Sequence, residues 1–278
     1  MFRLILSFVL IVSPVISLAQ SCGTRDLITE LGHEERAQLS ALVAPHPYPE
    51  GNLFLAEKPG SRVTVVGTLH LPDPRHDATI ARVQPEIEKA DVLILEASSA
   101  SQAEIQNMAT TRPEMFFLTE GPTLIDLLTE AEWAQLNKEL SAYGIPGFMA
   151  AKFQPWFLGM TLAVPPCAMA DIQRGEKGLD LLLERVAQEN GIPLAELDDI
   201  ESLMALLSGD PLEKQIEGLR LFLSMKVEGS AEMTTMVERY FQGKAREAVE
   251  FSRLLLEKKG VPVALFDEMM KGILEDRN

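Results

Sequence analysis

The chain has 278 residues, of which 46% are hydrophobic and 24% are charged, and its formal net charge is −16 at pH 7. This length allows one large domain or two small ones, and the composition excludes a wholly disordered protein. The acidic balance argues against a nucleic acid or an anionic membrane as partner, because both would repel the chain.

The first nineteen residues have the pattern of a secretory signal peptide. Arg3 supplies a positive charge, residues 4–15 are mostly apolar, and Ser17-Leu18-Ala19 forms a small-x-small cleavage site. The apolar run is shorter than the roughly 20 residues of a membrane span. We therefore expect cleavage before Gln20, no stable membrane span afterwards, and a periplasmic or secreted protein. An uncleaved anchor and a lipoprotein modified at Cys22 are the alternatives.

Two cysteines occur in the sequence, Cys22 and Cys167. An even number of cysteines in an exported chain predicts one disulfide bond between them. No CxxC or Cys/His spacing accompanies them, so we expect no zinc site at these residues.

The first elements alternate between helix and strand. Residues 24–42 show a helical pattern interrupted by Gly32, and residues 54–55 and 62–66 read as strands of a hairpin around a Pro-Gly turn. A helix capped by Asp77 is expected to run to Ala90, followed by a buried strand over residues 91–95.

From Ala103 onward the pattern is mostly helical, with a short strand expected over residues 193–197. No internal repeat or long linker divides the chain. We therefore expect a single α/β (α+β) domain over residues 20–278, in which many helices surround a small mixed, largely parallel sheet with a βαβ unit. The predicted helices cover residues 123–143, 147–161, 176–190, 199–207, 211–227, 232–242, 244–259 and 263–278.

The strand–helix–strand unit of residues 62–95 carries the candidate site. Its strands should be parallel, so that their carboxyl ends meet at the edge of the sheet where α/β proteins bind ligands. The first strand ends in Gly67-Thr68-Leu69-His70 and the second in Glu96. Imidazole and carboxylate are preferred ligands of Zn²⁺, Mn²⁺ and Co²⁺, and Gly67 would allow the backbone to approach a ligand closely. The alternatives are a histidine bonded to a loop and a glutamate that caps a helix.

Other polar groups offer weaker candidates. A second metal cluster would lie in a proline-rich loop, and a candidate serine nucleophile has neither a local histidine base nor a G-x-S-x-G elbow, so both are disfavoured. Two further residues are expected either to line the cleft or to cap and solvate helices. The metal cluster would consist of His76, Asp73 and Asp77, and the nucleophile would be Ser98 or Ser99. The two residues that would line the cleft are Asp180 and Lys152.

Several segments together resemble the TraB/GumN family, whose relatives include the animal Tiki proteins. They begin with GTLH (residues 67–70) after a buried strand and EKADVLILE (residues 88–96) about twenty residues later. GLD (residues 178–180), the following helix and GIP (residues 191–193) are similar to the middle region of the family. The resemblance covers the chain from about Arg62 to its last residue.

The resemblance implies a metal-dependent hydrolase, protease-like in the Tiki branch, whose site uses two GxxH motifs and a strand-end glutamate. Here the first motif is Gly67 to His70 and the glutamate is Glu96. The second motif should follow an Arg-Asn pair, which Arg277-Asn278 matches, and the sequence stops there. Either the chain is a fragment or the protein lacks half of its site. The final helix has no stop signal and few strands are predicted, which favours the fragment.

Two functions from different classes follow. The first is an exported hydrolase that binds a divalent ion (Mn, Co or Zn) through His70 and Glu96 and acts on a peptide or small-molecule substrate. The second is a non-catalytic protein of the same fold that holds a metal, haem or small ligand at that edge. A helical scaffold with no site is a third possibility.

Overall fold

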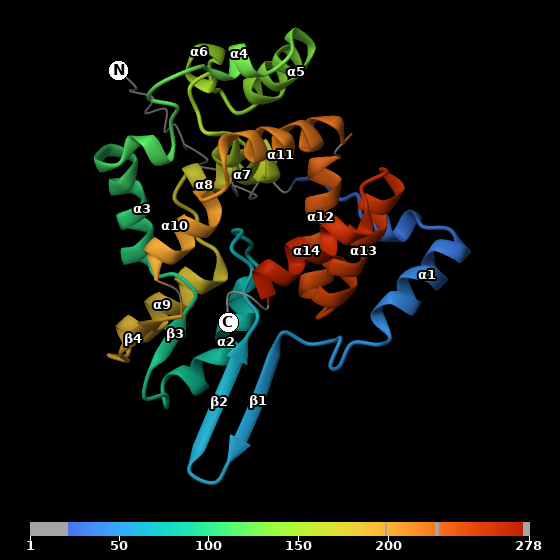
Figure 1. Cartoon of the computed structure of the whole chain (residues 1–278). Coiled ribbons are helices and arrows are strands. Elements are labelled where there is room, and N and C mark those ends of the chain that lie inside the picture. The colour runs from blue at the N-terminus through green and yellow to red at the C-terminus, as the bar shows by residue number, and fades with distance from the viewer. Residues whose placement is uncertain (1–21, 198, 226–227, 275–278) are drawn as a thin grey trace, which may run out of the picture.

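The computed structural model describes residues 22–197, 199–225 and 228–274, and Figure 1 shows many helices with two small pairs of strands in the lower part of the view. This arrangement confirms the predicted mixed α and β fold with little sheet and many helices. The predicted signal peptide (residues 1–19) and the Arg277-Asn278 pair lie outside the described residues.

Strands β1 (Leu53–Lys58) and β2 (Ser61–Val66) form the antiparallel hairpin that the sequence predicts. Gly60 in the connecting turn has a φ of +80°, a conformation that glycine adopts without steric cost. The hairpin projects away from the helices in Figure 1. The paired residues at its base, Leu53 and Val66, pack against the helical core. The packing at the base of the hairpin therefore fixes the position of the backbone just before Gly67.

The predicted pairing of the strand–helix–strand unit is wrong. Strand β3 (Leu93–Leu95) pairs in parallel with β4 (Leu194–Glu196), whereas β2 pairs only with β1 among the described strands. One mixed sheet was expected, and two separate two-stranded sheets are formed. The reason is that β3 contributes only three residues, and all of them find a partner in a segment about a hundred residues away. Periodicity along the sequence does not report such a distant partner.

Two helices, α2 (His76–Ile87) and α9 (Leu179–Glu189), nevertheless bring the two sheets together. Val83 and Leu183 belong to one buried cluster between these helices. The base of the hairpin and Leu93 of β3 pack against the same cluster. The ends of β2 and β3 therefore lie over a common apolar layer although no strand hydrogen bonds join them.

Turn chemistry divides the predicted helix of residues 123–143. It consists of α4 (Leu124–Leu127) and α5 (Glu130–Ser141), because the side chain of Thr129 caps α5 by accepting a hydrogen bond from the backbone N–H of Glu132 at 3.3 Å.

Prolines at the first helical position set other boundaries, since the proline ring needs no N–H there. The predicted helix of residues 147–161 consists of α6 (Gly147–Ala150) and α7 (Pro155–Ala163). Another such proline begins α8 (Pro166–Gln173), a helix that the sequence pattern did not predict. Asp77 does not cap α2, which begins one residue before it at His76.

Most of the remaining helices lie close to their predicted ranges. For the helix of residues 99–111 the sequence predicted only a mostly helical pattern from Ala103 onward, and the short 3-10 helix of residues 113–115 was not predicted. These elements are η1 (Leu27–Glu30), α1 (His33–Val43), α3 (Ser99–Thr111), η2 (Pro113–Met115), α10 (Ile200–Ser208), α11 (Leu212–Ser224), α12 (Gly229–Phe241), α13 (Ala245–Lys258) and α14 (Val263–Leu274).

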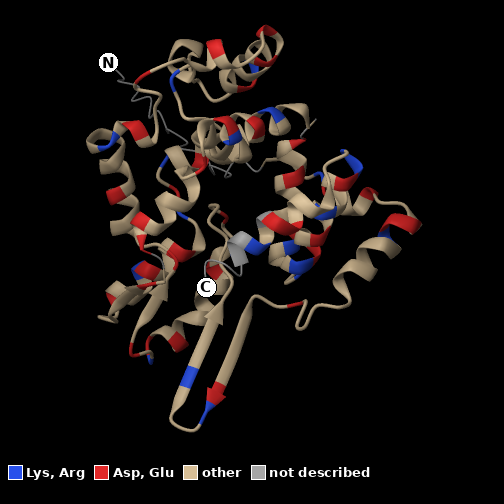
Figure 2. Ribbon diagram, viewed as in Figure 1, with Lys and Arg blue, Asp and Glu red and all other residues tan. Residues whose placement is uncertain are grey.

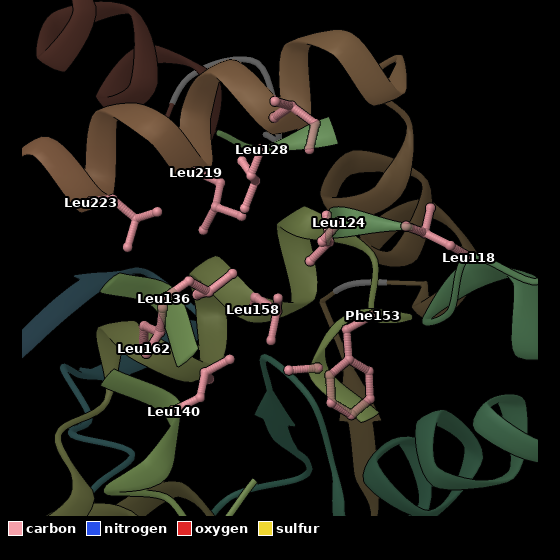
Figure 3. Packing of buried hydrophobic residues seen from close by; sticks show 12 residues of the cluster. Leu118, Leu124, Leu128, Leu136, Leu140, Phe153, Leu158, Leu162, Leu219 and Leu223 are labelled. Carbon is pink, nitrogen blue, oxygen red and sulfur yellow. The ribbon is translucent and has the colours of Figure 1, made fainter. Parts of the chain in front are cut away.

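A leucine-rich cluster joins α4, α5, α7 and α11. Figure 3 shows leucine side chains from these helices turned toward one another. Leu136, Leu140 and Leu158 have no exposed surface, and burial of each such side chain contributes roughly 1.5–3 kcal/mol to folding. The cluster contains none of the predicted site residues, so it acts as scaffold.

The predicted disulfide between Cys22 and Cys167 is present, with an S–S distance of 2.09 Å and a Cα–Cα distance of 5.3 Å. It joins the segment before η1 to helix α8. The same segment is held a second time by an ion pair between Asp26 and Arg239 of α12. The beginning of the described chain is thus fixed at two points.

The surface of the protein is acidic over many elements. Figure 2 shows Asp and Glu on most helices, whereas several Lys and Arg residues gather around α12 and α13. Within the part of the chain that the structure describes, no helix combines the length and apolar character that crossing a membrane requires.

Candidate functional site

His70 lies on the segment that leaves β2. The backbone N–H of Gly67 donates to the carbonyl of Asn52 at 2.8 Å, and the carbonyl of Gly67 accepts from the Tyr240 hydroxyl at 2.7 Å. Both backbone groups of Gly67 therefore have partners within the protein. The segment that carries His70 is held to the hairpin on one side and to α12 on the other.

The imidazole of His70 lies between two carboxylates. Its Nδ1 is 2.9 Å from Oδ1 of Asp180, in the first turn of α9, and its Nε2 is 3.4 Å from Oε2 of Glu96, directly after β3. The side chain of Asp180 is 9% exposed, whereas those of His70 and Glu96 are 61% and 43% exposed. A buried carboxylate thus anchors the ring while its other nitrogen and Glu96 face solvent.

A positive charge at Nε2 of His70 stabilises this arrangement. A carboxylate only accepts hydrogen bonds, so Nδ1–H of His70 donates to Asp180. In a neutral ring Nε2 then presents a lone pair to the carboxylate of Glu96, which is unfavourable. A proton on Nε2 or a cation beside it resolves the conflict. The hydrogen bond to Asp180 is the largest cause that raises the pKa of His70, and the charges of Asp180 and Glu96 raise it further.

The pair also has the chemistry of a metal site. In tetrahedral zinc sites the ligand atoms lie about 2.0–2.1 Å from the ion, which places two ligands roughly 3.3–3.4 Å apart. The separation between Nε2 of His70 and Oε2 of Glu96 is 3.4 Å. Asp180 takes the place of the outer carboxylate that orients many metal-binding histidines.

The number of candidate metal ligands among the described residues is small. Within the described ranges no group of three His, Cys, Asp or Glu residues is placed to hold one ion. The described residues therefore supply two candidate ligands and one orienting carboxylate, and catalytic zinc sites use three protein ligands.

The start of α9 packs directly on the His70 segment. The backbone N–H of Leu179 donates to the carbonyl of Leu69 at 3.0 Å. A Cβ atom at Gly178 would lie 2.4 Å from the carbonyl carbon and oxygen of His70, so only glycine fits there. The motif Gly178-Leu179-Asp180 thus combines close approach, a backbone hydrogen bond and the carboxylate for His70.

Two further carboxylates hold the turn that carries Glu96. Glu184 of α9 accepts hydrogen bonds from the backbone N–H of Ser99 at 2.8 Å and from its hydroxyl at 2.6 Å. Glu196 at the end of β4 accepts from the backbone N–H of Ser98 at 2.7 Å and from the hydroxyl of Ser101. Both serve the first turn of α3, where unpaired backbone N–H groups favour negative charge.

Sequence reasoning did not identify Glu184 or Glu196 as parts of this region. Glu184 could have been found from its spacing, because it lies one helical turn after Asp180 on the same face of a helix. Glu196 had no such signal, since its role depends on the parallel pairing of β3 with β4.

The alternative metal cluster of His76, Asp73 and Asp77 is not formed. His76 has no exposed surface, and its Nε2 lies 2.8 Å from the carbonyl oxygen of Leu71. Asp73 instead forms an ion pair with Arg75 at 2.8 Å. His76 is therefore a histidine of the core, against the rings of α12.

Ser98 and Ser99 have structural partners. The side chain of Ser98 caps α3 by accepting from the backbone N–H groups of residues 100 and 101, and the hydroxyl of Ser99 donates to Glu184. Lys152 lies between α6 and α7, where its carbonyl accepts from the backbone N–H of Leu118 at 2.7 Å. The hydrogen bonds of both serines explain their positions without a role as nucleophile.

The comparison with known families agrees with the GTLH and GLD segments. The profile of the TraB/PrgY/gumN family matches residues 52–278. The chain belongs to this family. The matched region includes His70, Glu96, Asp180 and Glu184, so every residue of the candidate site lies within it. Neither a curated protein nor a solved structure matches the chain significantly.

Proposed function

We propose that this member of the TraB/PrgY/gumN family is an exported, divalent-metal-dependent hydrolase that cleaves a peptide or ester-type bond at the His70–Glu96 pair. The observation that carries the proposal is the imidazole between two carboxylates, in which Nε2 of His70 and Oε2 of Glu96 approach to 3.4 Å. Two acceptors that face each other attract a cation, and Zn²⁺, Mn²⁺ and Co²⁺ all accept this mixture of nitrogen and oxygen.

Asp180, His70 and Glu96 have different roles in this proposal. Asp180 accepts the Nδ1–H of His70 and holds the ring in the tautomer whose Nε2 lone pair faces outward. His70 and Glu96 are the residues that would hold the ion. A divalent ion supplies Lewis acidity and lowers the pKa of water. Glu96, being partly exposed, is also the group placed to accept a proton from the attacking water and return it to the leaving group.

Export forms the second part of the proposal. The disulfide between Cys22 and Cys167 supports it, because disulfides persist in oxidising compartments such as the periplasm. Mass spectrometry of the protein recovered from the periplasm or medium should give Gln20 as the first residue. An intact Met1 on that material would contradict cleavage of a signal peptide.

The test of the metal site compares four proteins by inductively coupled plasma mass spectrometry after dialysis against Zn²⁺, Mn²⁺ or Co²⁺. We expect a bound ion in the wild type and in His33→Ala, a control that removes an exposed histidine at the start of α1. His70→Ala and Glu96→Ala should each lose that ion. Equal metal content in all four proteins would refute the assignment of His70 and Glu96.

A second assay decides between catalysis and binding. The metal-loaded wild type should cleave members of a mixed peptide and ester library, and His70→Ala should not. A wild type that binds the ion but cleaves nothing would replace the hydrolase by the alternative, a non-catalytic metal-binding protein. A wild type that neither binds an ion nor cleaves would overturn both.

A further inference from the structure

Helix α9 presents two buried carboxylates to the site, one helical turn apart. Asp180 and Glu184 are 6% and 3% exposed, respectively. Residues four apart lie on the same face of a helix, one above the other. Asp180 binds the imidazole that follows β2, and Glu184 binds the turn that follows β3. A single helix therefore contacts both halves of the His70–Glu96 pair.

The contacts of Glu184 are unusually complete for a buried carboxylate. Oε2 accepts from the backbone N–H of Ser99, and Oε1 accepts from the Ser99 hydroxyl and from the side-chain amide of Gln188 at 2.8 Å. The donors of these three hydrogen bonds are neutral groups. Burying a carboxylate costs free energy unless its oxygens are hydrogen-bonded, so these contacts hold the side chain of Glu184 in one position.

Ser99 is three residues after Glu96, and it begins helix α3. Fixing Ser99 therefore limits where the backbone of Glu96 can lie. On the other side, Gly178 and Leu179 at the start of α9 contact the backbone of residues 69 and 70. Helix α9 therefore sets the distance between Nε2 of His70 and the carboxylate of Glu96, and the pairing of strands does not.

We propose that Glu184 is a positioning residue for the His70–Glu96 pair: by binding Ser99 it holds the Glu96 turn on the same helix whose Asp180 orients His70. The expected effect of Glu184 on metal affinity rests on the proposed function. Its expected effect on the distance between His70 and Glu96 does not. Glu184 lies outside the His70–Glu96 pair, and it contacts the Glu96 turn through Ser99.

The first experiment measures Co²⁺ affinity from the visible absorbance of the bound ion. Glu184→Ala should weaken binding about 10–100-fold, the range found when groups that orient metal ligands are removed. Glu184→Gln keeps an acceptor for Ser99 and should restore part of the affinity. Ser99→Ala should weaken binding, and Glu184→Ala combined with Ser99→Ala should lose little more than Glu184→Ala alone, because both act on one contact.

A matched control separates positioning from general loss of stability. Thr129→Ala removes the cap of α5, beside the leucine-rich cluster, so it should reduce stability in urea and leave Co²⁺ affinity unchanged. If Glu184→Ala binds Co²⁺ as tightly as the wild type, the proposal is overturned. It is equally overturned if affinity falls in Thr129→Ala by as much as in Glu184→Ala.

The second experiment needs no metal. Crystal structures of the metal-free wild type and of Glu184→Ala and Ser99→Ala should show the 3.4 Å separation between Nε2 of His70 and Oε2 of Glu96 widening in the variants. An unchanged separation in both would remove the positioning role. If the wild type binds no Co²⁺ but the variants widen the separation, the proposed function fails and the role of Glu184 in the geometry stands.

Discussion

The substitution Gly178→Ala tests the close approach of α9 to His70. An added Cβ would lie 2.4 Å from the backbone carbon and oxygen of His70, whereas ordinary contacts begin near 3.4 Å. The start of α9 must therefore retreat by about 1 Å, the difference between these distances. The backbone of residue 178 fixes the position of the added Cβ, and the atoms that it meets belong to the backbone of His70, so no side-chain rotation can relieve the clash.

The cost of this retreat follows from the contacts that it breaks. The hydrogen bond from Leu179 to Leu69 would lengthen from 3.0 Å, and the contact of His70 with Asp180 from 2.9 Å, to distances outside hydrogen-bond range. Overpacking costs about 1–3 kcal/mol and a lost hydrogen bond about 1 kcal/mol. We expect Gly178→Ala to lower the free energy of unfolding by about 3 kcal/mol and Tm by roughly 6–12 °C.

Urea unfolding of the metal-free protein, followed by circular dichroism, measures this change. Gly159→Ala is the matched control, because a Cβ at this position of α7 would meet nothing within 4 Å. Replacing a helical glycine by alanine there should stabilise the protein by about 0.5–1 kcal/mol. If Gly178→Ala unfolds within about 0.5 kcal/mol of the wild type, well below the overpacking range, the close approach of α9 to His70 is refuted.

Three further predictions concern the disulfide and two titrating groups. Replacing Cys22 and Cys167 by serine should lower the free energy of unfolding by about 2–5 kcal/mol in urea, because the bond closes a loop with a sequence separation of 145. A variant as stable as the wild type would contradict it. Asp180→Asn should lower the pKa of His70 in metal-free protein, as followed by NMR of the ring protons, since Asp180 is the main cause that raises it. In the wild type the resulting stabilisation is complete below the unfolded pKa near 6.5 and is lost as the pH rises through the higher folded pKa. Burial raises the pKa of Tyr240 to about 12, so a phenolate absorbance step near pH 12 should disappear in Tyr240→Phe. Stability should fall between about pH 10 and 12, because the unfolded chain releases this proton first.

The sequence predicted the candidate pair for a reason that is only partly correct. A histidine after one strand and a glutamate after another were expected to meet because neighbouring parallel strands end at one edge. The two side chains do meet, but β2 and β3 are not paired with each other. What brings them together is the apolar layer of α2 and α9 beneath both strands.

Local chemistry determined much of the rest. Apolar periodicity and the Pro-Gly turn predicted the hairpin and most of the helices, and the even cysteine count predicted the bond between Cys22 and Cys167. The hairpin and the helices depend on residues near one another in sequence. The disulfide could be predicted because each cysteine has one possible partner in the chain. The breaks at Thr129 and Pro155 were missed, although capping and proline rules describe them, because the apolar pattern continues through them.

Only the tertiary structure decided which groups serve the site. The pairing of β3 with β4, the approach of Gly178 to His70 and the bonds of Glu184 to Ser99 join residues about 85 to 110 positions apart. Such contacts arise where helices and strands pack, and many different pairings would satisfy the same local pattern. The sequence therefore supplied the histidine and the glutamate, and packing on α9 set the distance between them.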